Sequence, residues 1–119
     1  MSPNDTAQVE EKVFHGMGGG VANTVVEGKA KLVRTVNASE VEDGEILITQ
    51  MTDVNMVKAM SKSKAVVTAL GGPLCHAAIV CAEYSKPFVV GAVGVMSIQT
   101  GDIVRINTGD GTVTVIGRS

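Results

Sequence analysis

Short apolar runs alternate with polar, turn-forming segments from residue 25 to the end of the chain. Runs rich in Val, Ile and Leu that are bounded by Gly, Asp or Pro are typical of buried strands. They predict strands within 25–36, 45–50, 64–70 and 87–92, the first of which is one strand or two short ones around Gly28. Two alternating runs, 103–106 and 112–116, flank the sequence NTGDG and predict a β-hairpin.

Two segments between these strands carry a helical pattern. Residues 52–63 place apolar side chains at helical spacing, and Thr52 or Asp53 can cap the N-terminus of this helix. A second helix is predicted from about residue 75 to residue 85, and Pro87 ends it.

The order of these elements predicts the architecture. Strand–helix–strand units at 45–70 and 64–92 imply right-handed crossovers in a largely parallel sheet, while the early strand and the late hairpin supply a second β layer. The expected fold class is therefore α/β: a mostly parallel sheet with crossover helices, a second β layer and a C-terminal hairpin.

The first 24 residues lack this periodicity. Residues 1–12 are polar and are predicted to form a flexible N-terminal arm, which leaves 13–119 as a single domain. The segment HGMGGGVANT (15–24) is rich in glycine and is predicted to be an entry loop rather than a phosphate-binding loop, since no strand is predicted before it.

Composition and charge narrow the function classes. The 119 residues are 45% hydrophobic with no Trp, so a core of aliphatic side chains is expected, and Met51, Met56 and Met60 are assigned to it. The net charge of −2, with no basic run, argues against nucleic-acid binding. No apolar segment is long enough to span a bilayer, and the acidic N-terminus is unlike a signal peptide, so the expected location is the cytoplasm.

The segment GGPLCHAAIVCAEYSKPFVVG (71–91) carries the candidate chemistry, because it places His76 at the start of a helix after two glycines. Glycines let a ligand approach the backbone, and the first helical turn presents unpaired N–H groups that favour an anion. Histidine can also act as a nucleophile at neutral pH. The residues alone leave two interpretations open: a phosphoryl-accepting His76, or a structural one that bonds locally.

Other chemistry in this segment is less well supported. A Cys75 nucleophile with His76 as its base is disfavoured, because adjacent helical residues point in different directions. Cys75, His76 and Cys81 fit no usual metal-ligand spacing, and a disulfide between the two cysteines is not expected. Lys86 is expected to be structural, near the helix C-terminus where a cation is favourable.

Residues 71–91 resemble the phosphohistidine signature of the swivelling domain in phosphoenolpyruvate (PEP)-utilising enzymes, which include PEP synthase, pyruvate phosphate dikinase and enzyme I of the sugar phosphotransferase system. The family pattern is roughly G-G-x-T-[SC]-H-A-A-I-x-A-R-x-x-x-x-P-x-[VI]-V-G. The resemblance extends over residues 28–116. The matching positions are Gly71, Gly72, Cys75, His76, Ala77, Ala78, Ile79, Pro87, Val89, Val90 and Gly91.

The resemblance implies a swivelling β/β/α fold and a role for each of several residues. It makes His76 the phosphorylated catalytic residue, with phosphate-binding positions at Gly71, Gly72, Cys75 and Ala77. It implies no cofactor or metal on this domain. It places Mg and ATP or PEP on partner proteins, namely an ATP-grasp protein, a PEP-binding barrel, or both.

Two positions depart from the family pattern. Leu74 stands where the family usually has Thr, and Ala82 stands where it usually has Arg, so a hydroxyl and a cation are missing from the expected site. Lys86 is the candidate replacement for the missing cation.

Two functions from different classes follow. In the first, His76 accepts a phosphoryl group from a donor protein and passes it to an acceptor such as pyruvate on a separate subunit, as a non-autonomous component of a dikinase-like phosphotransferase. In the second, the chain is a catalytically silent interaction or regulatory module that retains the fold. Binding of a small anion at the helix start without a covalent step is a third candidate. A homodimer through exposed sheet edges is compatible with each.

Overall fold

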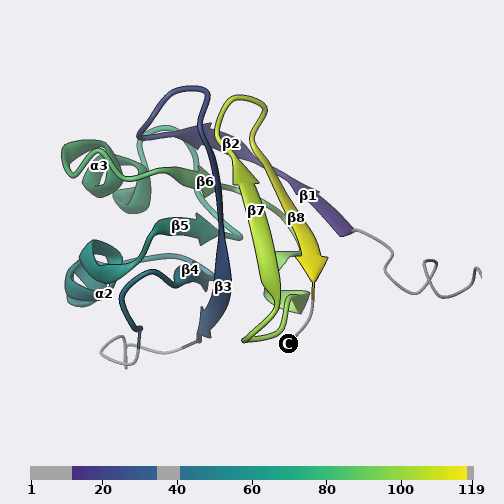
Figure 1. The fold of residues 1–119 in the computed structure, drawn as a ribbon. Helices are drawn as coiled ribbons and strands as arrows, with labels where there is room; N and C mark the ends of the chain where they lie inside the picture. Colours follow the sequence, from purple (N-terminus) through teal and green to yellow (C-terminus); the bar gives the residue numbers. More distant parts are fainter. Residues whose placement is uncertain (1–11, 35–40, 118–119) are drawn as a thin grey trace, which may run out of the picture.

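The computed structural model describes residues 12–34 and 41–117, and the fold is mixed α/β, as expected (Figure 1). Within these residues, two 3-10 turns, η2 (Val54–Met56) and η3 (Val95–Ser97), accompany two helices. The helices are α2 (Val57–Lys62) and α3 (His76–Glu83). The strands are β1 (Lys12–His15), β2 (Met17–Gly19), β3 (Val25–Val33), β4 (Ile46–Thr49), β5 (Ala65–Thr68), β6 (Phe88–Val90), β7 (Ile103–Asn107) and β8 (Thr112–Gly117).

The strands form a continuous hydrogen-bonded order β1-β8-β7-β3-β4-β5-β6-β2. The neighbours β3, β4, β5 and β6 are parallel, whereas β1, β8 and β7 add antiparallel pairs on one side and β2 pairs antiparallel with β6 on the other. In Figure 1 the two helices lie on one side of β4, β5 and β6, and the antiparallel group of β7, β8 and β1 lies on the other. The molecule therefore has three layers, with the parallel strands in the middle.

Strand β3 belongs to both β layers. Its first half, Val25–Lys29, pairs with β7, and its second half, from Ala30, pairs with β4. The strand is continuous through Gly28, so the choice between one strand and two is settled in favour of one. Because it changes partner along its length, β3 joins the antiparallel layer to the parallel one.

The parallel strands are buried on both faces, and their side chains alternate between two apolar clusters. One cluster lies between the two β layers and includes Ile48, Val67 and Val89. The other lies beneath the helices and includes Leu47 and Val66. The alternation follows from the two-residue period of a strand, and it explains why these segments read as unbroken apolar runs.

The sequence prediction of a loop over 15–24 was wrong for its first part, which contains the end of β1 and all of β2. Glycine is disfavoured in strands, which is why the propensity pattern missed them. Here the glycines are required by close backbone contacts: a Cβ at Gly16 would lie 2.5 Å from the carbonyl oxygen of Val90. The Gly16 N–H also donates to the Gly111 carbonyl at 2.8 Å. Gly16 therefore lets the chain pass from β1, which pairs with β8, directly into β2, which pairs with β6.

The N-terminal prediction is only partly testable. Residues 1–11 of the predicted arm lie outside the described residues, and Lys12 is the first residue of β1, opposite Val115.

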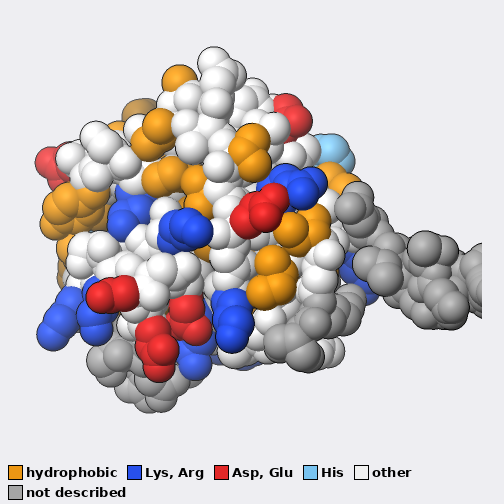
Figure 2. Space-filling model, viewed as in Figure 1, with side chains coloured by type: hydrophobic (Ala, Val, Ile, Leu, Met, Phe, Trp, Pro, Cys, Tyr) orange, Lys and Arg blue, Asp and Glu red, His pale blue; other side chains and the backbone are white. Residues whose placement is uncertain are grey.

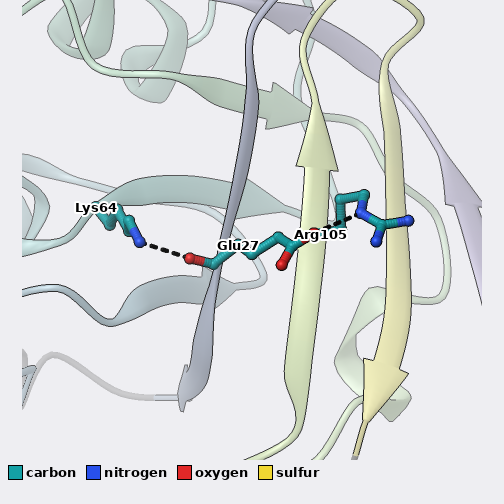
Figure 3. Close-up of polar contacts among 3 residues, drawn as sticks. All are labelled: Glu27, Lys64 and Arg105. Carbon is teal, nitrogen blue, oxygen red and sulfur yellow. Dashed lines mark hydrogen bonds and ion pairs between the residues drawn. The ribbon is translucent and has the colours of Figure 1, made fainter.

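The outer face of β3 carries a small polar network (Figure 3). Glu27 and Arg105 are directly opposed on β3 and β7, and the Arg105 Nε donates to the Glu27 carboxylate at 2.8 Å. Lys64 Nζ donates to the Glu27 backbone carbonyl at 2.6 Å, which ties the start of β5 to β3. Both charged side chains of the ion pair are about half exposed, so this pair contributes only about 0–1 kcal/mol to folding stability.

Charge is distributed over this face rather than concentrated. Figure 2 shows basic and acidic side chains interspersed among apolar ones. Among the described residues, no helix is both long and apolar enough to span a membrane.

We expect Gly16→Ala to lower the free energy of unfolding by roughly 2 kcal/mol, because the added methyl group must displace backbone atoms of β6. Urea unfolding followed by circular dichroism measures this. Gly117→Ala is the matched control, because its added Cβ would meet Ile103 only at ordinary contact distance, 3.6 Å. Equal stability changes in the two variants would contradict the close contact at Gly16.

Candidate functional site

A small hollow of about 90 Å³ lies at the carboxyl ends of β4 and β5, next to the start of α3. The carboxyl ends of parallel strands meet at one edge of a sheet, and this edge is where such folds place their ligand sites. The hollow is lined by Met51, Thr52, Thr68, Leu70, Gly71, Cys75, His76 and Ala77.

Glycine shapes the turn that leads from β5 to α3. Gly71 has φ of +119°, a conformation that other residues rarely adopt, and a Cβ there would also lie 2.8 Å from Cys75 Sγ. The backbone just after β6 packs directly against this turn. A Cβ at Gly91 would lie 2.7 Å from the Gly71 carbonyl oxygen, so this close contact requires glycine at position 91. Both glycines are needed for the chain to leave β5 and deliver His76 to the hollow.

His76 is the first residue of α3, and Cys75 is its N-cap. The Cys75 side chain makes no capping hydrogen bond, while its carbonyl accepts from the Ile79 N–H at 3.1 Å. The N–H groups of the first helical residues, His76, Ala77 and Ala78, have no carbonyl partner within the helix. This end of α3 therefore offers backbone donors and a partial positive charge to an anion.

Thr52 holds the His76 ring, because its Oγ1 lies 2.7 Å from His76 Nδ1. The two candidate caps of the first helix have separate roles: Asp53 Oδ1 accepts from the Asn55 N–H at 2.9 Å and caps η2, whereas Thr52 bonds the ring. Thr52 is buried, so its hydroxyl is fixed in place by its surroundings. When Nδ1 carries the ring proton and donates it to Thr52, the lone pair is on Nε2.

The structure brings four of the five candidate site residues to the hollow: His76, Gly71, Cys75 and Ala77. Gly72 does not line it; its carbonyl accepts from the Cys75 N–H at 3.1 Å, and a side chain at this position would meet nothing within 4 Å.

Sequence reasoning missed four lining residues, Met51, Thr52, Thr68 and Leu70. They follow or end β4 and β5, so the convergence of parallel strand ends was the signal that could have found them. Met51 was expected in the core and is exposed, whereas Met56 and Met60 are buried as predicted.

The structure shows where the two residues that depart from the family motif lie, and what Lys86 contacts. Leu74 is largely exposed and does not line the hollow, and the ring of His76 contacts the hydroxyl of Thr52. Ala82 is exposed on α3. Lys86 does not replace a missing arginine, because its Nζ donates to the carbonyls of Ser61, at 3.1 Å, and Ser63 at the end of α2. The prediction that Lys86 is structural is confirmed.

The two cysteines are free thiols in different environments: Cys75 is half-buried at the hollow, and Cys81 is on the buried face of α3. Burial raises the pKa of the Cys81 thiol to about 12, because the thiolate loses its hydration there. No group of three or more His, Cys, Asp or Glu side chains within 12–34 and 41–117 is arranged to hold a metal ion.

We expect iodoacetamide at pH 8 to alkylate Cys75 and spare Cys81 in the folded protein, since the thiolate is the reactive form. A pKa near 12 leaves Cys81 almost entirely protonated at that pH. Peptide mass spectrometry after a timed quench identifies the modified residue, and both cysteines should react in urea. Faster alkylation of Cys81 than of Cys75 in the folded protein would contradict the packing of α3.

Comparison with known proteins agrees with the geometry. The family "PEP-utilising enzyme, mobile domain" matches residues 41–111. A probable phosphoenolpyruvate synthase from Archaeoglobus fulgidus is 40% identical over 96 residues, which are 79% of this chain and 13% of that protein. The rifampicin phosphotransferase of Bacillus subtilis is 31% identical over 96 residues, 80% of this chain and 11% of that protein.

A solved structure shows the same likeness. The solution structure of an Enzyme I protein superimposes with a TM-score of 0.56 at 26% identity, over 65% of this chain and 32% of that one. This chain spans only about an eighth of the length of the two enzymes named above. The His76 motif, the three-layer fold and these matches lead to one conclusion: the chain belongs to the family of PEP-utilising enzyme mobile domains.

Proposed function

We propose that this chain is a phosphoryl carrier in which His76 Nε2 accepts a phosphoryl group from one partner protein and delivers it to an acceptor bound on another. The observation that carries the proposal is the bond between Thr52 Oγ1 and His76 Nδ1 at the N-terminus of α3. It holds the ring where the backbone donors at the start of α3 lie beside a small hollow.

The transfer consists of two displacements at phosphorus. In the first, the Nε2 lone pair forms a bond to the phosphorus of the donor, and the donor's P–O bond breaks with its electron pair leaving on oxygen. The Nδ1 proton stays on the ring and in its bond to Thr52. In the second, an acceptor oxygen bonds to phosphorus, the N–P bond breaks, and the electron pair returns to Nε2. Positioning and charge stabilisation dominate such transfers.

The described residues suit the first displacement in three ways. The Thr52 hydroxyl lies where it can accept the Nδ1 proton, and with the proton there the lone pair is on Nε2. The N–H groups at the start of α3 face the anion that forms there. Ala77 in the lining is small, so it leaves room for a donor to reach the ring.

The donor and acceptor are supplied by other proteins in this proposal. ATP with Mg on an ATP-grasp protein, or PEP on a barrel protein, would provide the phosphoryl group, and pyruvate is the acceptor that the family resemblance favours. Relatives of this chain include a probable phosphoenolpyruvate synthase and a rifampicin phosphotransferase, which points to more than one acceptor class within the family.

We expect phosphoramidate, a small donor that needs no docking, to phosphorylate His76 faster than His15, which lies exposed on β1. Displacement of ammonia by the ring nitrogen forms the N–P bond. Intact-mass measurements on His76→Ala and His15→Ala, with and without acid treatment, assign the label. No acid-labile label, or a label only on His15, would favour the silent interaction module instead.

Thr52→Val should slow labelling of His76 by about 5- to 10-fold, the rate equivalent of one lost hydrogen bond. It should also lower the Nδ1–H tautomer fraction in ¹⁵N NMR spectra of the ring. Thr52→Ser keeps the hydroxyl and should restore both properties. A normal tautomer ratio and rate in Thr52→Val would remove Thr52 from the proposal.

A further inference from the structure

A second groove, of about 630 Å³, lies at the end of β3. Leu32 and Arg34 line it from this strand end, and residues 96–100, which include the end of η3, supply the rest of its lining. It shares no lining residue with the hollow at His76. Its volume is in the range of clefts that bind ligands.

The end of β3 forms an open strand edge along this groove. Strand β7 pairs with β3 only as far as Lys29. At Ala30 the backbone N–H and carbonyl both bond to the loop before β7, each at 2.8 Å. The next N–H on this side belongs to Leu32, and it donates to a side chain, Thr100 Oγ1, at 3.0 Å. The regular ladder on this side of β3 therefore ends inside the groove.

Alternation along the strand leaves two further backbone groups at this edge. Because the N–H groups of Ala30 and Leu32 face the side of β7, the Leu32 carbonyl and the Arg34 N–H, which come next, face the same way. Neither of them has a hydrogen-bond partner within the part of the chain that the structure describes. An acceptor and a donor in this arrangement can bond the main chain of an extended segment beside β3.

Arg34 supplies positive charge in the groove. Its Nη2 donates to a neutral acceptor, the Met96 carbonyl, at 3.2 Å, which uses one of the five N–H donors of the guanidinium group. Among the described residues no carboxylate lies within ion-pair distance of Arg34, whereas Arg105 is paired with Glu27. The guanidinium group can therefore bind a carboxylate through two of its remaining donors.

We propose that this groove binds an extended peptide segment of another protein, which adds beside the end of β3 and places a carboxylate on Arg34. The peptide main chain bonds the Leu32 carbonyl and the Arg34 N–H. An apolar side chain of the peptide packs on Leu32 and Met96, which are partly buried against the cluster between the β layers. Only a short segment fits, because Thr100 already occupies the edge at the Leu32 N–H.

A free small acid uses less of this groove than a peptide does. It would bond the guanidinium group and contact the apolar wall, but it has no main chain for the open strand edge. The carboxylate of the peptide is either its C-terminus or an acidic side chain, and both present the same two oxygens to Arg34.

The experiment titrates the ¹⁵N-labelled full chain with four ligands and follows its amide signals by two-dimensional NMR. The acid peptide is Ac-Thr-Val-Leu-OH, and the amide peptide, Ac-Thr-Val-Leu-NH₂, differs from it only in lacking the carboxylate. The side-chain peptide, Ac-Thr-Glu-Leu-NH₂, carries the carboxylate on Glu instead. Isocaproate is a free acid with an apolar body and no main chain.

At least one of the two carboxylate peptides should shift the amide signals of Arg34 and of residues 96–100. It should bind at least about 10-fold more tightly than the amide peptide, because a charge-assisted hydrogen-bond pair is lost in the latter. The tighter of the two identifies the source of the carboxylate, a C-terminus or an acidic side chain.

Arg34→Gln should weaken this binding by about 10-fold or more. Arg34→Lys should weaken it as well, because an ammonium group lacks the planar pair of donors. The matched control is Arg105→Gln, which removes an exposed arginine that already has a carboxylate partner. It should leave the affinity unchanged within about 2-fold, as expected for a change outside the site.

Each contrary result overturns the proposal. These results are no shift of any signal at about 5 mM peptide, equal binding of the carboxylate peptides and the amide peptide, and unchanged affinity in Arg34→Gln. Isocaproate binding as tightly as the peptides would overturn the assignment to a peptide, and shifts confined to the lining of the His76 hollow would overturn the location. None of these measurements requires phosphorylated His76, so their outcome is independent of the proposed function.

Discussion

The burial of the parallel strands on both faces is the constraint from which the remaining structure follows. Residues of β4, β5 and β6 alternate between two apolar clusters, so these strands need a covering layer on each side. The helices cover one face, and the antiparallel strands cover the other. The loops at the carboxyl edge are left outside the apolar layers, and that edge is where His76 and Thr52 lie.

Glycine makes close approach possible at two points of this architecture. Gly16 lets β1 and β2 diverge to opposite ends of the strand order, and Gly71 with Gly91 lets the backbones at the ends of β5 and β6 touch. The second contact bears on function, because the turn at Gly71 sets where α3 begins. The same helix start gives the His76 ring its position and supplies backbone donors for an anion. Fold and candidate chemistry thus depend on the same few small residues.

Much of this could be predicted from periodicity. The parallel strands and the helices α2 and α3 lie inside the predicted ranges, and each hairpin strand extends one residue beyond its range, since strongly apolar runs bounded by turn residues have few alternatives. Strand β2 (MGG) could not be predicted because glycine lowers strand propensity, and β1 (KVFH) is only four residues long. The contacts that favour both strands come from distant partners, β8 for β1 and β6 for β2. Tertiary contact overrides local preference in that segment.

Only the site residues that lie close to His76 in the sequence could be predicted. The motif around His76 gave the histidine and three neighbours that line the hollow, whereas Thr52 lies in the segment that follows β4, 24 residues away. Its contact with the ring depends on how the chain after β4 packs beside α3, and nothing local to position 52 indicates this. In the proposed carrier, Nε2 of His76 bears the phosphoryl group while Nδ1 keeps its proton and its bond to Thr52. NMR of the ¹⁵N-histidine-labelled, phosphorylated protein distinguishes the two ring nitrogens. We expect ³¹P coupling to Nε2 of His76 and a retained Nδ1 proton; coupling to Nδ1, or phosphorus on His15 alone, would overturn this assignment.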